Sequence, residues 1–254
     1  MLHTATAWIA SAAPGWATTH QRATACMDLG TCFFILDDSP GDLALDRYAD
    51  LERAASGAAP DPARPLQSVF AALFERLAGT GGSLAHYLAL RVEFARALRR
   101  RHALRTGTAV SVAEYMLLRE TTIYFAPWMS TWELLGGFVL SPEERALVAP
   151  AYAPANRWQV LENERFSVAR DARTGTPNVV ALHAAERGLP LANADREVAE
   201  RADAELAAFR TATGRLMATA RSPAVAAYLD ALVAAVVGAR RHNRAADPAR
   251  YAAS

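Results

Sequence analysis

The chain has 254 residues, of which 27 are basic and 26 acidic, and its formal net charge is +1 at pH 7. This balance argues against a nucleic-acid-binding role, because such proteins carry a clustered excess of positive charge. Apolar residues make up 52% of the sequence, enough for a substantial core. The two cysteines are too few for a disulfide framework and lack zinc-site spacing, so we expect a reducing, cytoplasmic compartment.

Neither secretion nor membrane insertion is predicted. The first fifteen residues lack the basic and apolar regions of a signal peptide. The most apolar run, from Ala224 to Gly238, is interrupted by Asp230 and is shorter than a membrane span.

Helices are predicted almost throughout, because Ala, Leu, Arg and Glu dominate and the alternation typical of strands is scarce. Clusters of Gly and Pro divide the chain at 39–41, 56–65, 79–82, 150–154 and 175–177. In chain order, helices are predicted to end at Phe33–Asp38, to begin after Ser83, and to cover Trp158–Arg173, Glu197–Met217 and Pro223–Arg241. Short links and one apolar core predict an all-α, single-domain helical bundle over residues 1–254.

Three carboxylates follow the apolar run Phe33-Phe34-Ile35-Leu36, and they are Asp37, Asp38 and Asp42. A Pro-Gly pair prevents the helix from continuing, so Asp37 and Asp38 would lie at a helix C-terminus, where the macrodipole is already negative. Carboxylates crowded there repel one another unless a cation binds them, and oxygen-only ligands favour Mg²⁺. A solvated acidic turn explains the same residues about equally well.

A second group of oxygen ligands is predicted on the helix over Trp158–Arg173. Asn163, Ser167 and Asp171 are spaced by four and four, and each step of four turns about 400°, so the three side chains share one face. An amide oxygen, a hydroxyl and a carboxylate could chelate one hard cation. The alternative is an ordinary polar face turned to solvent. Arg170 is either a phosphate ligand beside this site or a surface charge.

Together the two groups resemble the metal-binding motifs of bacterial class I terpene synthases. That family carries an Asp-rich motif after an aromatic run and, on a second helix, an Asn/Asp-x-x-x-Ser/Thr-x-x-x-Glu triad. It also carries a diphosphate-sensing Arg some forty-odd residues before the triad, and an Arg-Tyr pair near the C-terminus. Here the Arg is Arg119, 44 positions before Asn163, and the pair is Arg250-Tyr251.

The resemblance implies an all-α enzyme with its active site in a central cavity, where three Mg²⁺ ions hold a linear prenyl diphosphate. The implied metal ligands are Asp37, Asp38, Asp42, Asn163, Ser167 and Asp171. The implied diphosphate ligands are Arg119, Arg170, Arg250 and Tyr251. Loss of pyrophosphate would leave an allylic cation that becomes a linear or cyclic terpene hydrocarbon or alcohol. Farnesyl diphosphate is the expected substrate, with geranyl and geranylgeranyl diphosphate as alternatives, and a homodimer is left open.

The cation would form in an apolar pocket that excludes water and stabilises it with aromatic faces. Phe33 and Phe34 match a family position above the Asp-rich motif, and Thr122 and Ile123 would form a bend after the sensing Arg. Further candidates for the lining are Tyr124, Phe125, Trp128, Trp132 and Trp158. An aromatic side chain on an apolar helix face is more often a core residue, which is the alternative for each of these five.

The sequence departs from the family pattern in several places. Asp42 comes five residues after Asp37 instead of four, the triad ends in Asp171 instead of Glu, and Glu164 stands where Asp is common. Family members usually have several tens of residues more before the Asp-rich motif, so we expect the first helices to be short or missing. An impaired or non-catalytic homologue that binds metal and diphosphate therefore stays open. A prenyl-chain-elongating synthase is less favoured because it needs a second Asp-rich motif.

Overall fold

The computed structural model describes residues 24, 41–78, 83–104 and 109–245. For residues 41–42 and 242–245 only the backbone is described. Every element in the described part of the chain is a helix. The helices are α3 (Gly41–Ala55), α4 (Pro65–Leu77), α5 (Leu84–Ala103), α6 (Val112–Thr122), α7 (Phe125–Gly136), α8 (Pro142–Thr174), α9 (Val179–Arg187), α10 (Leu191–Thr219) and α11 (Pro223–Ala245). The prediction of an all-α bundle is confirmed.

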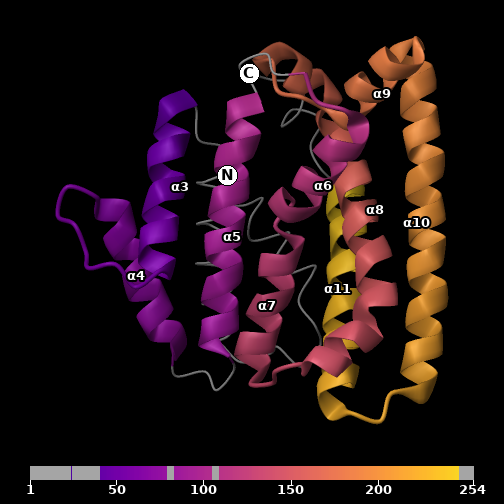
Figure 1. Ribbon diagram of the computed structural model, residues 1–254. Helices are drawn as coiled ribbons and strands as arrows, with labels where there is room; N and C mark the ends of the chain where they lie inside the picture. The colour runs from indigo at the N-terminus through magenta and orange to yellow at the C-terminus, as the bar shows by residue number, and fades with distance from the viewer. Residues whose placement is uncertain (1–23, 25–40, 79–82, 105–108, 246–254) are drawn as a thin grey trace.

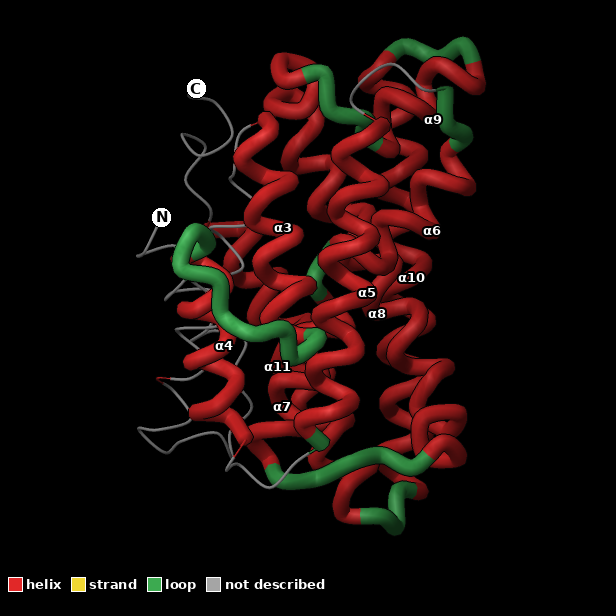
Figure 2. The backbone as a smooth tube through the Cα atoms, turned by 60° about the vertical axis from the view of Figure 1, so that its left-hand side comes forward, coloured by secondary structure: helices red, strands yellow, loops and turns green. Residues whose placement is uncertain are grey.

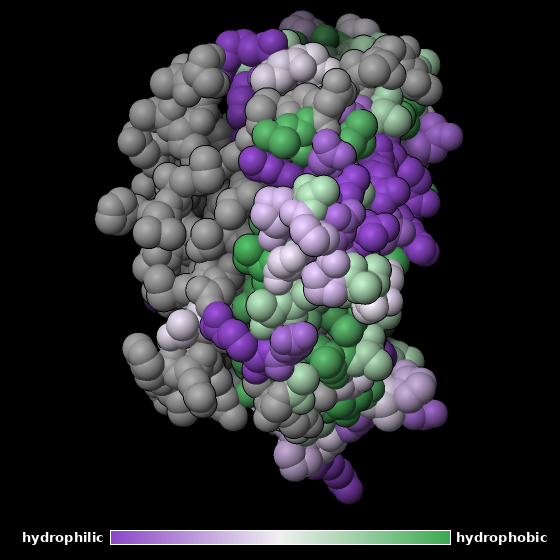
Figure 3. Space-filling view, turned by 90° about the vertical axis from the view of Figure 1, so that its left-hand side faces the viewer, coloured by the Kyte–Doolittle hydropathy of each residue, from purple (hydrophilic) through white to green (hydrophobic). Residues whose placement is uncertain are grey.

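The long helices stand side by side in one bundle (Figure 1). Helices α3 and α5 pack together on one side, α8 and α10 pack together on the other, and α7 lies between these pairs. Most loops gather at the two ends of the bundle (Figure 2). Seen from the side of α3 and α4, the surface mixes hydrophilic and hydrophobic residues, and no broad apolar face stands out among the described residues (Figure 3). The described helices share one buried core.

Local sequence signals explain where several helices begin. The Ser83 side chain accepts a hydrogen bond from the His86 amide, which confirms the predicted N-cap of α5. At the start of α8, Ser141 and Glu144 form a capping box, in which each side chain accepts from the other's amide, at 3.1 and 2.9 Å. The inward positions predicted for the helix after Glu197 are confirmed on α10, where Val198, Leu206 and Phe209 are buried.

The predicted break at Pro150–Pro154 is wrong, because α8 continues through both prolines and its 33 residues begin at Pro142 instead of near Trp158. A proline inside a helix removes the amide that would bond to the carbonyl four residues earlier. Pro150 and Pro154 are themselves four residues apart, so both missing bonds fall on one side of α8. The long contact of α8 with α10 holds the helix together across this defect.

Helix α11 corrects the expectation about membrane spans. Its stretch Pro223–Arg241 has a mean hydropathy of 1.4 and is long enough to cross a membrane, in spite of Asp230. Half of this stretch is buried inside the bundle, as in the core helix of a globular protein. Its apolar composition therefore agrees with its packing against α7 and α8.

The chain bends between α6 and α7, where the resemblance placed a bend. Helix α6 ends at Thr122 and α7 begins at Phe125. Tyr124 has a φ of 69°, which makes it the one non-glycine residue with positive φ in the described part of the chain. For a residue with a bulky side chain this left-handed conformation is strained, so the surrounding contacts must hold it in place.

Replacing Ser141 with alanine tests the cap of α8. The variant loses the acceptor for the Glu144 amide and is expected to lower the free energy of unfolding by about 1 kcal/mol. Urea denaturation measures this change. Ser141→Thr, which keeps a capping hydroxyl, is the control and should stay close to the parent, so equal losses in the two variants would contradict the capping role.

Candidate active site

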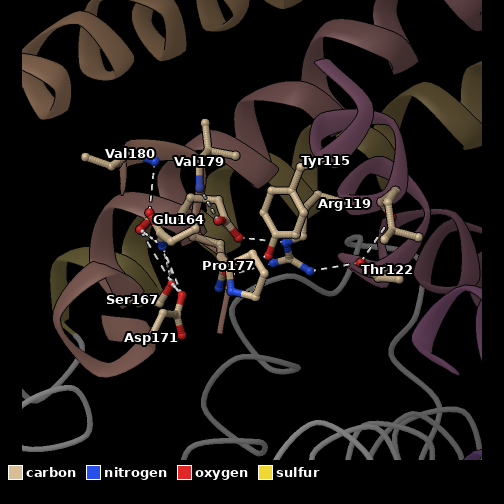
Figure 4. Close-up of polar contacts among 12 residues, drawn as sticks. Tyr115, Arg119, Thr122, Glu164, Ser167, Asp171, Pro177, Val179 and Val180 are labelled. Atoms are coloured by element: carbon tan, nitrogen blue, oxygen red, sulfur yellow. Dashed lines mark hydrogen bonds and ion pairs between the residues drawn. The ribbon is translucent and has the colours of Figure 1, made fainter. Parts of the chain in front are cut away.

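The centre of the site is a buried arginine in the last turn of α6 (Figure 4). The Arg119 side chain is 3% exposed, and its Nε lies 2.6 Å from Oε1 of Glu164 on α8. Its Nη1 donates to the Thr122 hydroxyl at 3.0 Å, and its Nη2 donates to Oδ1 of Asn163 at 2.9 Å. All three guanidinium nitrogens therefore have partners, and one of these partners carries the balancing charge.

Glu164 connects three helices. Its side chain is fully buried, and its second carboxylate oxygen, Oε2, accepts from the Val179 amide at 2.9 Å. That amide lies at the start of α9, where the helix dipole favours a negative charge. The sequence reasoning registered Glu164 only as a departure from the family pattern. The sequence does carry a signal for this ion pair, because an acidic residue, Glu164, directly follows the predicted metal ligand Asn163 and could balance the charge of Arg119.

The predicted triad lies along one face of α8. Ser167 donates its hydroxyl proton to Oδ2 of Asp171 at 2.5 Å, and both residues are buried. The Arg170 guanidinium lies 3.2 Å from Oδ1 of the same carboxylate. Asn163 lies further along the helix with its carbonyl oxygen turned to Arg119. The structure thus brings together Arg119, Arg170 and the three triad residues, while their roles in binding stay predictions.

Asn178 is a site residue that the sequence reasoning did not single out. Its Nδ2 donates to Oδ2 of Asp171 at 2.9 Å and to the Glu164 carbonyl at 2.8 Å. Its Oδ1 accepts from the Val180 amide and so caps α9. An Asn before an apolar helix start signals an N-cap, but its reach to Asp171 depends on the turn at Gly175. This glycine ends α8 with a φ of 64° and returns the chain toward the triad.

Tyr115 holds this turn from the side of α6. Burial, and to a smaller extent the charge of Glu164, raises the pKa of the Tyr115 hydroxyl above its usual range. The hydroxyl therefore keeps its proton at neutral pH and donates it to the Pro177 carbonyl at 2.5 Å. The turn between α8 and α9 is tied in this way to the helix that carries Arg119.

The triad offers the donor set of a hard cation. Asn163, Ser167 and Asp171 supply an amide oxygen, a hydroxyl oxygen and a carboxylate, which suit Mg²⁺ better than zinc. Among the described residues, no group of three or more His, Cys, Asp or Glu side chains could hold a metal ion, and the triad itself contains one carboxylate. Arg119 and Arg170 now hydrogen-bond to two of the three ligands. A cation there would face two guanidinium groups, and an anion that binds with it would relieve that repulsion.

Several predicted site residues lie outside the described part of the chain. They are Phe33, Phe34, Asp37, Asp38, Arg250 and Tyr251. Asp42 lies in the first turn of α3, and its side chain is not described. The predicted Asp-rich site is therefore represented only by the backbone of its last carboxylate residue.

The predicted pocket residues on α6 and α7 are buried around the bend. Thr122 and Tyr124 are almost fully buried, and Ile123 between them is packed against the core. On α7, Trp128 and Trp132 meet edge to face with ring centroids 5.0 Å apart. Phe125 packs on Tyr152 of α8, with centroids 5.6 Å apart.

Trp158 has a different position from the other pocket candidates. It is buried on α8, five residues before Asn163, and so lies about 140° around the helix from that triad residue. This angle turns the Trp158 side chain away from the face that carries the triad. A pocket role for Trp158 stays a prediction.

Comparison with known proteins identifies the family. The sequence profile described as terpene synthase family 2, C-terminal metal binding, matches residues 28–208, which is more than half of the chain. The chain belongs to terpene synthase family 2. A search of curated proteins found no match. The match includes the Asp-rich segment, Arg119, the triad and Asn178, and it shows that the family is one of metal-binding enzymes.

Solved terpene synthases have the same fold. The linalool/nerolidol synthase from Streptomyces clavuligerus, in complex with 2-fluorogeranyl diphosphate, is 21% identical, with a TM-score of 0.78 over 90% of this chain and 84% of that one. The 2-methylisoborneol synthase from Streptomyces coelicolor A3(2), in complex with Mg²⁺ and geranyl-S-thiolodiphosphate, is 15% identical, with a TM-score of 0.80 over 94% and 81%. The germacradien-4-ol synthase from Streptomyces citricolor is 18% identical, with a TM-score of 0.78 over 94% and 84%.

These likenesses confirm the bacterial class I terpene synthase fold for the bundle. With the family match, they also confirm that the protein is a terpene synthase. At this level of identity they carry neither substrate nor product to this chain.

Replacing Glu164 with glutamine tests the buried ion pair of this terpene synthase. The amide keeps the shape of the side chain but leaves the Arg119 charge buried without its counter-charge, so the free energy of unfolding should fall by about 3 kcal/mol. Glu162→Gln is the matched control on the same helix. Its partner Arg165 is 30% exposed, and such pairs contribute roughly 0–1 kcal/mol. Urea denaturation of both variants measures the difference, and equal losses would contradict a special role for the Glu164 pair.

Proposed function

We propose that this terpene synthase ionises a linear prenyl diphosphate, with farnesyl diphosphate as the first candidate, to pyrophosphate and a linear or cyclic terpene hydrocarbon or alcohol. The observation that carries the proposal is the buried Arg119 beside the oxygen triad of α8. This arrangement places a fixed positive charge next to three hard-cation ligands, as the binding of a diphosphate with its metal requires. Geranyl and geranylgeranyl diphosphate are the alternative substrates.

Arg119 is built to exchange partners. Two of its three contacts are to neutral oxygens, those of Thr122 and Asn163, and only the contact to Glu164 is an ion pair. Phosphate oxygens form stronger, charge-assisted hydrogen bonds than a hydroxyl or an amide does. We therefore infer that diphosphate replaces Thr122 and Asn163 as partners of Arg119, while Glu164 keeps the guanidinium in place.

The release of Asn163 frees its carbonyl oxygen for a metal ion. Asp171 would be freed in the same way when Arg170 turns from the carboxylate to a phosphate oxygen, and Ser167 would rotate its hydroxyl. Three Mg²⁺ ions are proposed, and Asp37, Asp38 and Asp42 would supply the remaining carboxylates. When bound, Mg²⁺ neutralises the charge that develops on the departing diphosphate. Arg250 and Tyr251 are proposed as further hydrogen-bond donors to the leaving group.

The apolar side of the bend would receive the allylic cation. Trp128 and Trp132 have the largest π surfaces among the candidates on α6 and α7, and a tryptophan face binds cations better than tyrosine or phenylalanine. Because Trp128, Trp132 and Thr122 are almost fully buried, water is excluded from that side of the bend. A cytoplasmic location and the oligomeric state stay predictions.

Turnover is tested by incubating the protein with Mg²⁺ and, separately, with geranyl, farnesyl and geranylgeranyl diphosphate. Release of pyrophosphate with a terpene hydrocarbon or alcohol supports the proposal. Longer prenyl diphosphates would mean chain elongation instead. Binding of Mg²⁺ and diphosphate without turnover would mean a non-catalytic homologue.

Replacing Asp171 with asparagine is expected to lower kcat/KM by on the order of 100-fold, because the triad loses its charged ligand. Asp195→Asn is the matched control, since Asp195 is a half-exposed carboxylate on α10 that pairs with Arg165. Pyrophosphate release at saturating Mg²⁺ measures both variants. A parent-like Asp171→Asn variant would remove the triad from the proposed site.

Mg²⁺ and inorganic pyrophosphate are expected to stabilise the protein together far more than either does alone. The reason is that a cation at the triad faces Arg119 and Arg170 until an anion binds with it. At about 100 times its Kd, a ligand adds roughly 2.7 kcal/mol to the free energy of unfolding. Thermal unfolding with each ligand and with both measures this effect, and additive shifts would contradict the proposal.

A further inference from the structure

Arg91 is a buried arginine outside the site described so far. It lies on α5 with 2% of its surface exposed, and its Nη2 donates to the Pro127 carbonyl at 3.1 Å and to the Thr131 hydroxyl at 3.0 Å. Both acceptors belong to α7. Arg91 therefore joins α5 to the part of α7 that follows the bend.

The guanidinium of Arg91 makes cation–π contacts with two aromatic rings and has no ion pair with a carboxylate in the described part of the chain. Its guanidinium carbon lies 4.2 Å from the ring centroid of Tyr87 and 4.9 Å from that of Tyr124. No carboxylate in the described part of the chain lies within ion-pair distance of Arg91, and its buried Nη1 has no hydrogen-bond partner there. A desolvated cation with these neighbours depends on the two rings and on the α7 acceptors, which makes its geometry specific.

Tyr124 is the strained residue of the bend, and Arg91 holds it. The left-handed conformation of Tyr124 persists only if its surroundings fix it. Arg91 covers one face of its ring, and Phe94 contacts the ring edge to face at 5.2 Å. The Tyr124 carbonyl in turn accepts from the Trp128 amide at 2.9 Å, the bond that starts α7.

We propose that Arg91 is a positioning residue that fixes the bend between α6 and α7 and thereby aims Trp128 at the substrate cation. The proposal deepens the proposed function and rests on it. Arg91 holds the residue before Trp128 through the Pro127 carbonyl, and it holds Tyr124, to which the Trp128 amide is bonded. The backbone of Trp128 is therefore restrained from both sides.

The bend is also close to Arg119, because Thr122, a hydrogen-bond partner of Arg119, lies two residues before Tyr124. The Thr122 hydroxyl accepts from Arg119, and Ile123 caps α6 through a bond from its amide to the Arg119 carbonyl. Release of Thr122 when diphosphate binds would loosen the α6 side of the bend. Arg91 would keep the α7 side fixed, so that Trp128 stays in place while the leaving group is bound.

The contact with Arg91 also distinguishes Tyr124 from Trp128 within the predicted lining. One face of the Tyr124 ring already binds the Arg91 cation. A second cation near the same ring would be repelled by that guanidinium. Of the two tryptophans on α7, Trp128 is the one bonded to the Tyr124 carbonyl and next to Pro127, and it is the ring we assign to the substrate cation.

Arg91→Met tests the proposal in the intact protein, with Arg96→Met as the matched control. Arg96 lies on the same helix, is 63% exposed and pairs with Glu52. In Arg91→Met, kcat should fall on the order of 10-fold with little change in KM, because substrate binding is kept and alignment is lost. The share of acyclic and water-quenched products should rise. Arg91→Lys, which keeps a cation for the rings, should recover part of both effects.

A purely structural role would lower the thermal unfolding temperature and leave the product ratio unchanged, and that result would overturn the proposal. Parent-like kcat and products in Arg91→Met would overturn it as well. The proposal also predicts a changed near-UV circular dichroism spectrum, because the Trp128–Trp132 pair would shift, and no such change in Arg96→Met. This spectrum needs no turnover. If the parent protein is inactive, the proposed function fails, while an unchanged Arg91→Met spectrum separately refutes the positioning role.

Discussion

The buried ion pair between Arg119 and Glu164 is the interaction on which the site depends. A charge on each partner is taken out of water, and such a pair is tolerated only when its remaining hydrogen-bonding groups are satisfied. Here Thr122, Asn163 and the Val179 amide complete the set. The pair therefore fixes the relative positions of α6, α8 and the start of α9, which are the three elements that bring the ligands together.

Charge is the reason why we propose a diphosphate with its metal for this arrangement. Arg119 and Arg170 lie against the same oxygens that a cation would use. A cation there would be repelled by the two guanidinium groups, whereas the proposed diphosphate would bind both the arginines and Mg²⁺. The hydrogen bond from Ser167 to Asp171 and the one from Arg119 to Asn163 satisfy these three side chains in the structure.

The bend between α6 and α7 carries a second constraint. A helix that continued past Thr122 would point Trp128 in another direction, so the left-handed Tyr124 sets the course of α7. This conformation is held from outside the helix, by Arg91 and Phe94 of α5. The contact with the buried Arg91 therefore explains how the strained conformation of Tyr124 is maintained.

The sequence by itself determined the helical class, the starts of α5 and α11 and the spacing of the triad, because helix propensity, capping and a period of four residues are local properties. It also determined the family, through motifs whose order is visible in the chain.

Local reasoning failed at Pro150 and Pro154, where packing along α10 outweighs the cost of two prolines. The partners of Glu164, Asn178 and Arg91 could not be predicted either. They lie 15 to 45 residues away along the chain for Glu164, 7 to 14 for the side-chain nitrogen of Asn178 and 36 to 40 for the hydrogen bonds of Arg91. Only the tertiary structure decided those contacts, because most buried polar groups need a partner, and the packing of the helices determines which partner is within reach.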